Sequence, residues 1–505
     1  MWLQQVLDQR RSSAPDAIAL RDVRRNVTWS RLHRDAHALA HTIAAHTTPG
    51  DRVIILSTNC VEVLVAVFAC ALSATIAVPL NPALTDHELT AILKQVTPSY
   101  AFADTNGLPR LRHLHQGLPL LAIHSAADLP DSPAPDALGG AGLTDPVMIL
   151  HTSATTGSPK GVVCDQNYFQ SQAASWKAEV GQDQRDTYLH TSPLCHGSIT
   201  IALDYLCAGA PVTVLDQFTP HDFLTAVEQW QVRHTFLVPT MLQLLLDCRQ
   251  LSESDLTSLR LVTHGGAPCP PKLAHQAGQA IGSAMRTIFG ITEGGGPVLS
   301  LAPNDKPEAP AVAGATCAGR PMPGVTARIT TAQGRPAHPY QAGTLHLKSA
   351  ALMRGYWNDP QATTQTIVDG WLNTGDLGYQ DAEGRIWILN RRSDLILRGG
   401  QNVYPAEVEH VLRTLEWVTE AAVVPAPCTT SGQTPVAFIQ PTATDDFDER
   451  ELIAHCIRNL AGYKRPTRFI PIQTLPRNTV GKLLRRPLEQ HAADLASSDE
   501  PGRPA

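Results

Sequence analysis

Short apolar runs rich in β-branched residues recur along the first half of the chain. They cover residues 52–58, 146–151, 211–216 and 259–265. Longer segments with helical spacing lie between them, as at 222–233 and 239–249. Strands that alternate with helices are typical of α/β layers built on largely parallel sheets. We therefore predict an α/β fold for this part of the chain.

Residues 63–80 are nearly uncharged and about as long as the shortest segment that can cross a bilayer. The Ala, Ser and Thr in this segment make it mildly polar, and residues 73–79 have the pattern of a break followed by a short buried strand. We predict a buried helix followed by a strand, and no membrane span.

The pattern changes after Gly343. Residues 344–349 and 384–390 alternate apolar and polar side chains, which favours antiparallel strands in a smaller β-rich layer. From Asp394 a compact α+β unit is predicted, with helices at 405–415 and 448–460. Two stretches rich in Pro, Gly and Asp, 128–146 and 302–315, are predicted to be surface loops. The segment 491–505 has no periodic apolar face and is predicted to be a disordered tail.

Composition narrows the possible partners. The 505 residues carry 40 basic and 46 acidic side chains, a formal net charge of −6, with no long run of like charges, so nucleic acid is not expected as a partner. The ten cysteines form no CxxC pair and are expected to be reduced thiols. The N-terminal residues lack the apolar stretch of a secretory signal, and we expect a cytoplasmic protein.

A polar segment at 151–161 follows the strand that ends at Leu150. Its sequence, HTSATTGSPKG, combines hydroxyl groups, glycine and lysine, and its backbone N–H groups could wrap phosphate oxygens. The spacing of a Walker loop is absent. By itself the segment fits a phosphate loop and an ordinary polar turn about equally well.

Four further motifs follow the polar segment in order. They are FGITE at 289–293, GWLNTGDLG at 370–378, RRSDLILRGGQNVYPAEVE at 391–409 and PRNTVGKLLRR at 476–486. Together the five segments resemble the adenylate-forming superfamily, which contains acyl-CoA synthetases, luciferases and the adenylation domains of peptide synthetases. The resemblance implies ATP-dependent activation of a carboxylic acid as acyl-AMP with release of pyrophosphate, followed by thioester formation with coenzyme A.

The same resemblance implies a division of the chain. A large N-terminal domain, residues 1–392, would hold two α/β layered sheets and a smaller β-rich unit as three subdomains. A small α+β lid domain would cover 393–490, with the active site between the two domains. Ser393 would be the hinge, at a position where family members usually carry Asp or Lys.

The carboxylate and the α-phosphate are both anions and must approach each other in line. The reaction would therefore require cations and fixed dipoles that neutralise their charge. The resemblance implies that Thr155 and Glu293 hold Mg²⁺, which prefers hard oxygen ligands, and that Thr292 bonds the α-phosphate. Lys482 resembles the mobile lysine that contacts the reacting carboxylate during adenylation. The residues that would cradle the departing pyrophosphate are Thr152, Ser153, Thr156, Gly157 and Lys160.

The nucleoside would be held by separate segments. Asp376 resembles the residue that accepts both ribose hydroxyls, a task that suits a carboxylate, and Arg391 would approach the ribose from the hinge side. The residues that would line the adenine and the adjoining phosphate are Gly265, Gly266, Ala267, Phe289 and Gly290.

The acyl pocket is expected near His196. Peptide-synthetase relatives place an aspartate at this position, and without it a buried ammonium would lack a counter-ion, so a free α-amino acid is disfavoured. Gly294, Gly295 and Gly296 remove three side chains beside apolar walls that begin at Val238. This indicates either a pocket for a bulky, mainly apolar acid or a flexible turn.

The acceptor thiol is expected to be coenzyme A. Gly399 and Gly400 resemble the backbone that lines the pantetheine tunnel of acyl-CoA synthetases, and Lys464 and Arg465 supply charge for nucleotide phosphates. An alternative is an acyl-AMP ligase that loads a separate carrier protein. A third hypothesis, from another class, is a non-catalytic ATP-binding sensor.

Overall fold

The computed structural model shows two compact units. It describes residues 2–124, 140–152, 159–305, 307, 310–312, 314–391, 394–398, 401–428, 431–443, 446–478 and 481–498. Unit 1 consists of Met1–Pro303, Pro321–Thr326 and Leu347–Leu372. Unit 2 consists of Asn304–Arg320, Ala327–His346 and Asn373–Ala505.

The first sheet of unit 1 has the order β18-β8-β7-β4-β3-β5-β6. Its strands are β3 (Arg52–Leu56), β4 (Ile76–Leu80), β5 (Tyr100–Ala103), β6 (Leu120–Ala122), β7 (Pro146–Thr152), β8 (Lys160–Asp165) and β18 (Gly355–Tyr356). The strands from β7 to β6 are parallel, whereas β8 is antiparallel to β7 and to β18.

A second sheet in unit 1 follows the order β14-β13-β12-β11-β9-β10-β1-β2. Its strands are β1 (Ile18–Arg21), β2 (Asn26–Thr28), β9 (Tyr188–His190), β10 (Val212–Val214), β11 (His234–Leu237), β12 (Leu261–His264), β13 (Ala284–Ile291) and β14 (Gly296–Leu301). The strands from β13 to β1 are parallel, as the alternation of strands and helices predicts. The α/β prediction for this part is confirmed.

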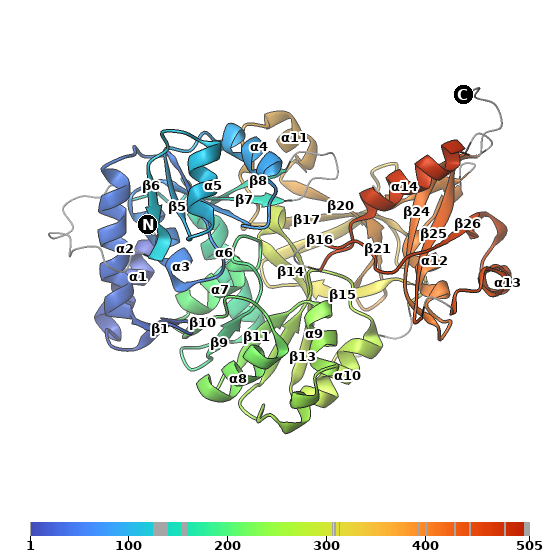
Figure 1. The fold of residues 1–505 in the computed structure, drawn as a ribbon, viewed down its shortest axis with the longest axis horizontal. Coiled ribbons are helices and arrows are strands. Elements are labelled where there is room, and N and C mark those ends of the chain that lie inside the picture. The colour runs from blue at the N-terminus through green and yellow to red at the C-terminus, as the bar shows by residue number, and fades with distance from the viewer. Residues whose placement is uncertain are drawn as a thin grey trace. The chain divides into compact units, whose positions relative to one another are not determined.

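Helices cover the sheets of unit 1 (Figure 1). They are α1 (Trp2–Ser13), α2 (Trp29–Ala44), α3 (Val61–Leu72), α4 (Asp86–Val96), α5 (Gly107–Leu114), α6 (Gln166–Val180), α7 (Ile199–Cys207), α8 (Pro220–Trp230), α9 (Pro239–Leu246), α10 (Pro271–Ile281) and α11 (Pro360–Thr366). Polar side chains start several of them: Thr85 makes a capping box with Glu88, and Asp165 accepts from the Tyr168 N–H.

The apolar segment 63–80 forms a buried helix and a buried strand. Every residue of α3 is buried, and so is every residue of β4. Among the described residues, no helix is both long and apolar enough to span a membrane. The segment is apolar because it lies inside the core of unit 1, where Phe68 of α3 shares a cluster with the buried Trp29 and Trp176.

Unit 2 contains antiparallel strands and a smaller α+β layer. The strands β16 (Val325–Thr330), β17 (Gly343–Ser349), β20 (Trp371–Gln380), β21 (Ile386–Arg391) and β15 (Thr316–Pro321) follow one another in this order. A separate sheet has the order β23-β22-β25-β24, with β26 parallel to β25. Its elements are β22 (Ile396–Arg398), β23 (Gln401–Val403), α12 (Pro405–Leu412), β24 (Val418–Cys428), β25 (Gly432–Pro441), α13 (Glu449–Asn459) and β26 (Arg468–Pro471).

The final helix, α14 (Arg485–Ser498), corrects one prediction. Residues 491–498 are helical, so the predicted disordered tail is wrong over this stretch, and residues 499–505 lie outside the described residues. Leu488 and Ala492, one helical turn apart, are buried in a cluster that includes Phe438 of β25. Burial against the sheet, which local periodicity did not reveal, holds the helix.

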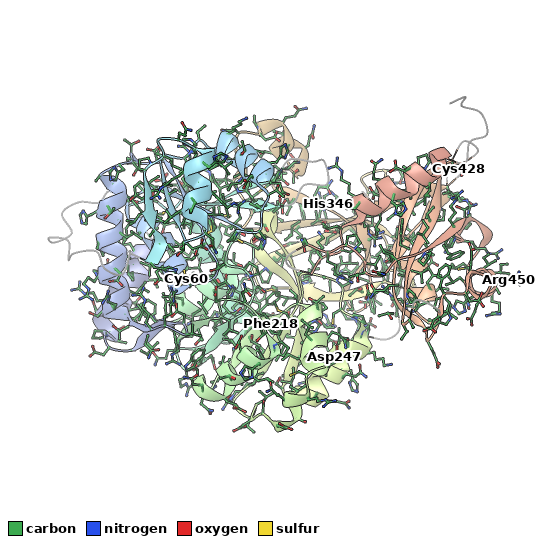
Figure 2. All side chains as sticks on the ribbon, viewed as in Figure 1. Cys60, Phe218, Asp247, His346, Cys428 and Arg450 are labelled. Carbon is green, nitrogen blue, oxygen red and sulfur yellow. The ribbon has the colours of Figure 1, made fainter. Side chains whose placement is uncertain are left out.

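All ten cysteines are free thiols; Figure 2 labels Cys60 in unit 1 and Cys428 in unit 2. Burial is the main reason that the pKa of the Cys60 thiol is raised to about 12. The predicted domain boundary at residue 392 differs from the division into compact units, because 373–391 cluster with the C-terminal residues. That boundary stays a prediction.

Candidate active site

The carboxyl ends of four neighbouring parallel strands define one edge of the second sheet in unit 1. The strands β9, β11, β12 and β13 are adjacent and parallel. The segments that follow them are 191–198, 238, 265–267 and 292–296. In open α/β sheets, ligands bind outside the carboxyl ends of the strands. Predicted acyl, adenine and phosphate residues of unit 1 therefore come to a single edge.

The predicted phosphate loop begins and ends on a strand pair. Thr152 is the last residue of β7, Lys160 is the first of β8, and the two are directly paired. The predicted site residues Ser153, Thr155, Thr156 and Gly157 lie outside the described residues. The antiparallel pair returns the chain after a short connection, so Thr152 and Lys160 are held at the same end of the sheet.

Glu293 is linked to Lys160 through a tyrosine. The Tyr356 hydroxyl donates a hydrogen bond to Glu293 Oε1 at 3.0 Å. Lys160 Nζ lies 4.7 Å from the centroid of the same aromatic ring, within the range of a cation–π interaction. The backbone oxygen of Glu293 accepts from the Met353 N–H at 3.0 Å. A carboxylate held in this way is a hard oxygen donor that fits Mg²⁺.

Thr292 is held by a hydrogen bond from Tyr168 and lies close to Gly197. Its backbone oxygen accepts a hydrogen bond from the Tyr168 hydroxyl at 2.9 Å. Burial, with smaller effects from Cys164 and Glu293, raises the pKa of Tyr168 well above its ordinary value, so the hydroxyl stays a donor. A Cβ at Gly197 would lie 3.2 Å from Thr292 Oγ1. The predicted acyl segment therefore runs beside the predicted α-phosphate ligand.

The loop after β12 needs glycine at two of its three predicted adenine positions, Gly265 and Gly266. A Cβ at Gly265 would lie 2.3 Å from the Ile288 carbonyl oxygen, which no side chain tolerates. Gly266 has φ +79°, in the left-handed region that glycine favours. The backbone at Gly265 thus approaches that of Ile288 on β13 closely. Ala267 follows directly, and Phe289 on β13 is half-buried while Gly290 is exposed.

His196 bridges the carboxyl edges of the two sheets of unit 1. The Asn81 amide, just after β4, lies 3.3 Å from His196 Nε2. Burial lowers the pKa of His196, so the neutral ring accepts this hydrogen bond. Val238 is buried close to Gly266, where an added Cβ would be 3.6 Å from Val238 Cγ1.

The glycine run 294–296 is tightly packed. A Cβ built at these positions would lie 2.7 Å from Ile291 Cγ2, 2.6 Å from Ala351 Cβ and 2.7 Å from Thr200 Oγ1, respectively. Gly295 and Gly296 also have φ values of +107° and +91°. Neighbouring atoms fill the room beside each Cα. The structure thus favours a tight turn over an opening for the acyl group at Gly294, Gly295 and Gly296.

Asn59 holds the acyl segment in place, although no motif contains it. Its amide donates to the carbonyl oxygens of Ser192 and Leu215, at 2.8 and 3.0 Å, and its oxygen accepts from the Leu194 N–H at 2.8 Å. Tyr168 and Tyr356 were missed as well. Asn59 and Tyr356 lie outside the motifs, and Tyr168 lies just after the polar segment 151–161, so spacing within the motifs held no signal for them.

Unit 2 holds the predicted ribose ligands. Asp376 on β20 is buried, and its N–H donates to Thr374 Oγ1 at 3.0 Å. The backbone of Asp376 pairs with that of Arg391 on β21. The two residues are therefore brought together as the motifs predict, although the side chain of Arg391 is not described.

Lys482 lies in a tight turn. Its N–H donates to Asn478 Oδ1 at 2.8 Å, and the Asn478 N–H donates to its carbonyl oxygen at 2.9 Å. Gly481 supplies the φ of +77° that the turn needs. The glycine next to the predicted catalytic lysine therefore has a structural cause.

The two basic residues predicted for coenzyme A are already engaged. Lys464 Nζ lies 2.7 Å from Glu407 Oε1, and although burial opposes it, this partner raises the pKa of Lys464. Arg465 donates to the carbonyl oxygens of Leu460 and Ile457 at 2.9 and 3.2 Å, which closes the end of α13. Gly399, Gly400 and the hinge Ser393 lie outside the described residues.

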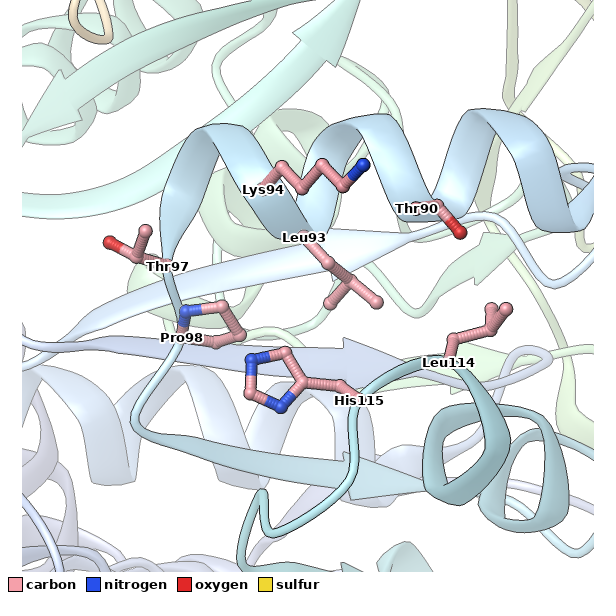
Figure 3. Close-up of a pocket in the computed structure, with 7 residues that line it drawn as sticks. All are labelled: Thr90, Leu93, Lys94, Thr97, Pro98, Leu114 and His115. Carbon is pink, nitrogen blue, oxygen red and sulfur yellow. The ribbon is translucent and has the colours of Figure 1, made fainter.

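A pocket of about 340 Å³ lies between α4 and the end of α5, in another part of unit 1 (Figure 3). Leu93, Pro98 and Leu114 line it together with Lys94 and His115. It contains none of the residues that the motifs identify, and we assign it no part in the reaction.

The comparisons with known proteins agree with this geometry. The family model of the AMP-binding enzymes matches residues 7–357, and that of the AMP-binding enzyme C-terminal domain matches residues 407–482. The chain belongs to the AMP-binding enzyme family. Predictions of an adenylate-forming fold and of an acid–thiol ligase are thereby confirmed.

Relatives of this AMP-binding enzyme include two kinds of ligase. The fatty acid–acyl-carrier-protein ligase ScoC of Streptomyces coeruleorubidus is 32% identical over 92% of this chain and 91% of its own. The 2-succinylbenzoate–CoA ligase of Geobacillus kaustophilus is 33% identical over 96% of this chain and 97% of its own. A solved structure of the O-succinylbenzoate coenzyme A synthetase of Bacillus subtilis, in complex with ATP and magnesium ion, is similar with a TM-score of 0.85, 30% identity, and coverage of 95% of this chain and 98% of that one.

Proposed function

We propose that this AMP-binding enzyme joins a mainly apolar carboxylic acid to coenzyme A through an acyl-adenylate. In the first step a carboxylate oxygen bonds to the α-phosphorus of ATP and pyrophosphate leaves. In the second the sulfur of coenzyme A bonds to the acyl carbon and AMP leaves. ATP, Mg²⁺ and coenzyme A are the cofactors, and the 2-succinylbenzoate–CoA ligases support the choice of thiol.

The observation that carries this proposal is the linked group Lys160, Tyr356 and Glu293 beside Thr292. When bound, Mg²⁺ would neutralise charge on the phosphate oxygens. Glu293 would hold the ion together with Thr155, and Lys160 would place a positive charge near the departing pyrophosphate. Thr292 would bond the α-phosphate, and its position depends on the donor Tyr168.

Three residues of unit 2 have the remaining roles in the proposed reaction. Asp376 would accept the ribose hydroxyls, Arg391 would contact the ribose, and Lys482 would contact the reacting carboxylate as its negative charge shifts to pyrophosphate. Neutral His196 would face the acyl group, and it offers no counter-charge for an ammonium, so α-amino acids should be poor substrates. A cytoplasmic location stays a prediction from the sequence.

A carrier-protein ligase is the second candidate. It is favoured by the similarity to ScoC and by the engagement of Lys464 with Glu407, which leaves less charge for the phosphates of coenzyme A. A phosphopantetheine arm on a carrier protein offers the same thiol without the nucleotide.

A panel of acids tests both candidates. Aryl, branched and straight-chain acids and amino acids are incubated with ATP and Mg²⁺, with either coenzyme A or a carrier protein bearing phosphopantetheine. We expect pyrophosphate release with apolar acids and a thioester of coenzyme A by mass spectrometry. A thioester formed with the carrier protein alone would establish the second candidate, and absence of ATP–pyrophosphate exchange with every acid would favour the non-catalytic sensor.

A further inference from the structure

Two helices at the start of unit 1 bring together three metal-ligating side chains. Asp8 lies on α1, and His33 and His37 lie on α2. His33 Nε2 is 3.1 Å from Asp8 Oδ1, and the centroids of the two imidazole rings are 4.3 Å apart. One potential ligand atom from each residue lies within 4.8 Å of the other two.

The helical spacing explains why the two rings meet. Residues four apart on an α-helix lie on one face, one turn above the other. His41 continues the same face by one more turn. Because α1 packs against α2, the carboxylate of Asp8 reaches this face from the neighbouring helix.

Both ring nitrogens of His37 are buried. In the part of the chain that the structure describes, neither His37 Nδ1 nor Nε2 has a hydrogen-bond partner, and the same holds for His41 Nε2. Buried polar atoms are normally paired, and each exception requires an explanation. An ion that accepts the lone pair of a ring nitrogen would satisfy it.

We propose that Asp8, His33 and His37 form a binding site for a divalent transition-metal ion of the zinc type. Two imidazoles and one carboxylate are a donor set of borderline softness, which suits zinc rather than magnesium or calcium. Ligand atoms about 2.0–2.1 Å from a tetrahedral ion lie roughly 3.3 Å apart, close to the separation of His33 Nε2 and Asp8 Oδ1. Water completes the coordination, and the ion ties α1 to α2.

A second cluster of ligand-type side chains in unit 1 is a poorer metal site, because its carboxylate is already paired. Cys60, Glu62 and His124 also lie within ligand distance of one another. However, Glu62 already forms ion pairs with Arg24 and Arg25 at 3.1 Å each, so its negative charge is balanced. No arginine pairs with Asp8 among the ion pairs of the described residues.

Zinc titration of the untagged, chelator-treated full chain tests the site. Co²⁺ replaces Zn²⁺ for visible absorption, and melting temperature is measured with and without Zn²⁺. We expect one ion to bind to the parent and to raise its melting temperature. His33→Ala and His37→Ala should each weaken affinity by on the order of 10²-fold or more, because even outer-shell changes cost 10–100-fold. His275→Ala, an exposed histidine on α10, is the matched control and should behave as the parent.

Asp8→Asn keeps the size of a side chain that is half exposed, so it tests the site without risk to folding. It should weaken Zn²⁺ binding at least tenfold and leave the melting temperature of the metal-free protein unchanged. Binding that survives in all three ligand variants would mean that cysteines elsewhere hold the ion, and would overturn the proposal. Absence of Zn²⁺ binding by the parent would overturn it too.

Discussion

Tyr356→Phe removes one oxygen from the group that links Lys160 to Glu293. The lost contact is the hydrogen bond from the Tyr356 hydroxyl to Glu293 Oε1, at 3.0 Å. The aromatic ring remains, so the contact of Lys160 Nζ at 4.7 Å is retained. The substitution therefore tests the hydrogen bond that positions the Glu293 carboxylate, which we propose as a ligand of Mg²⁺.

The size of the effect follows from the charge on the acceptor. A hydrogen bond to a charged group contributes about 1.5–3 kcal/mol. Tyr356 and Glu293 are both only partly buried, so water replaces some of the loss and the lower end of that range applies. Since 1.4 kcal/mol corresponds to a factor of about ten, we expect kcat/KM for MgATP to fall roughly tenfold.

The assay is pyrophosphate release at varied ATP and varied Mg²⁺. The loss should appear mainly as a higher requirement for MgATP, and it should shrink as Mg²⁺ is raised. Tyr356→Leu removes the ring as well, and with it a cation–π interaction of about 0.5–1 kcal/mol, so its loss should be roughly two- to fivefold greater. Tyr340→Phe, at an exposed tyrosine of unit 2, is the matched control and should be silent.

Two results would refute this reasoning. If Tyr356→Phe kept the parental dependence on Mg²⁺ and MgATP, the hydroxyl would not position Glu293 for the reaction. If Tyr356→Phe and Tyr356→Leu were equally impaired, the ring would not contribute through Lys160. A loss explained by unfolding would appear as a lower melting temperature and is measured in parallel.

Further predictions concern the lid lysine, the glycine turn and a buried histidine. Lys482→Ala should reduce pyrophosphate release from ATP and acid by on the order of 10²–10³ yet still form thioester from supplied acyl-adenylate and coenzyme A; equal loss in both steps would make the lysine structural. Gly295→Ala should destabilise unit 1 by about 1–3 kcal/mol in urea unfolding, because its Cβ would lie 2.6 Å from that of Ala351 at a residue with φ +107°. The preference between short and long acids should not change. Gly282→Ala, with φ +72° and nothing within 4 Å of its Cβ, is the control, and an equal loss there would exclude the clash as the cause. Burial lowers the pKa of His190 to about 4, against about 6.5 in the unfolded chain. The contribution of the neutral ring to stability is therefore complete above about pH 6.5. It is lost as the pH falls towards 4, by up to about 1.4 kcal/mol per pH unit. The free energy of unfolding at pH 5.5 relative to pH 7.5 should therefore drop less in His190→Phe than in the parent, and an identical drop would contradict the assignment.

Local periodicity was sufficient for most of the elements. The strands at 52–56 and 146–152 and the helices at 220–230 and 405–412 all lie within a few residues of their predicted ranges. A strand or helix buried on one face has a side-chain period that the sequence itself displays. The helix α14 was missed because its burial depends on a partner surface, the side of β25 that carries Phe438.

The candidate site likewise has residues that the motifs predicted and contacts that only the structure revealed. The five motifs identified the family and predicted site residues such as Glu293, Asp376 and Lys482, since the proposed reaction requires particular side chains. Only the tertiary structure decided that Tyr356, 63 residues after Glu293, donates to it, and that Glu407 neutralises Lys464. It also decided that the glycines at 294–296 serve close packing. Contacts of this kind depend on which surfaces meet after folding, and spacing within one segment holds no record of the partner.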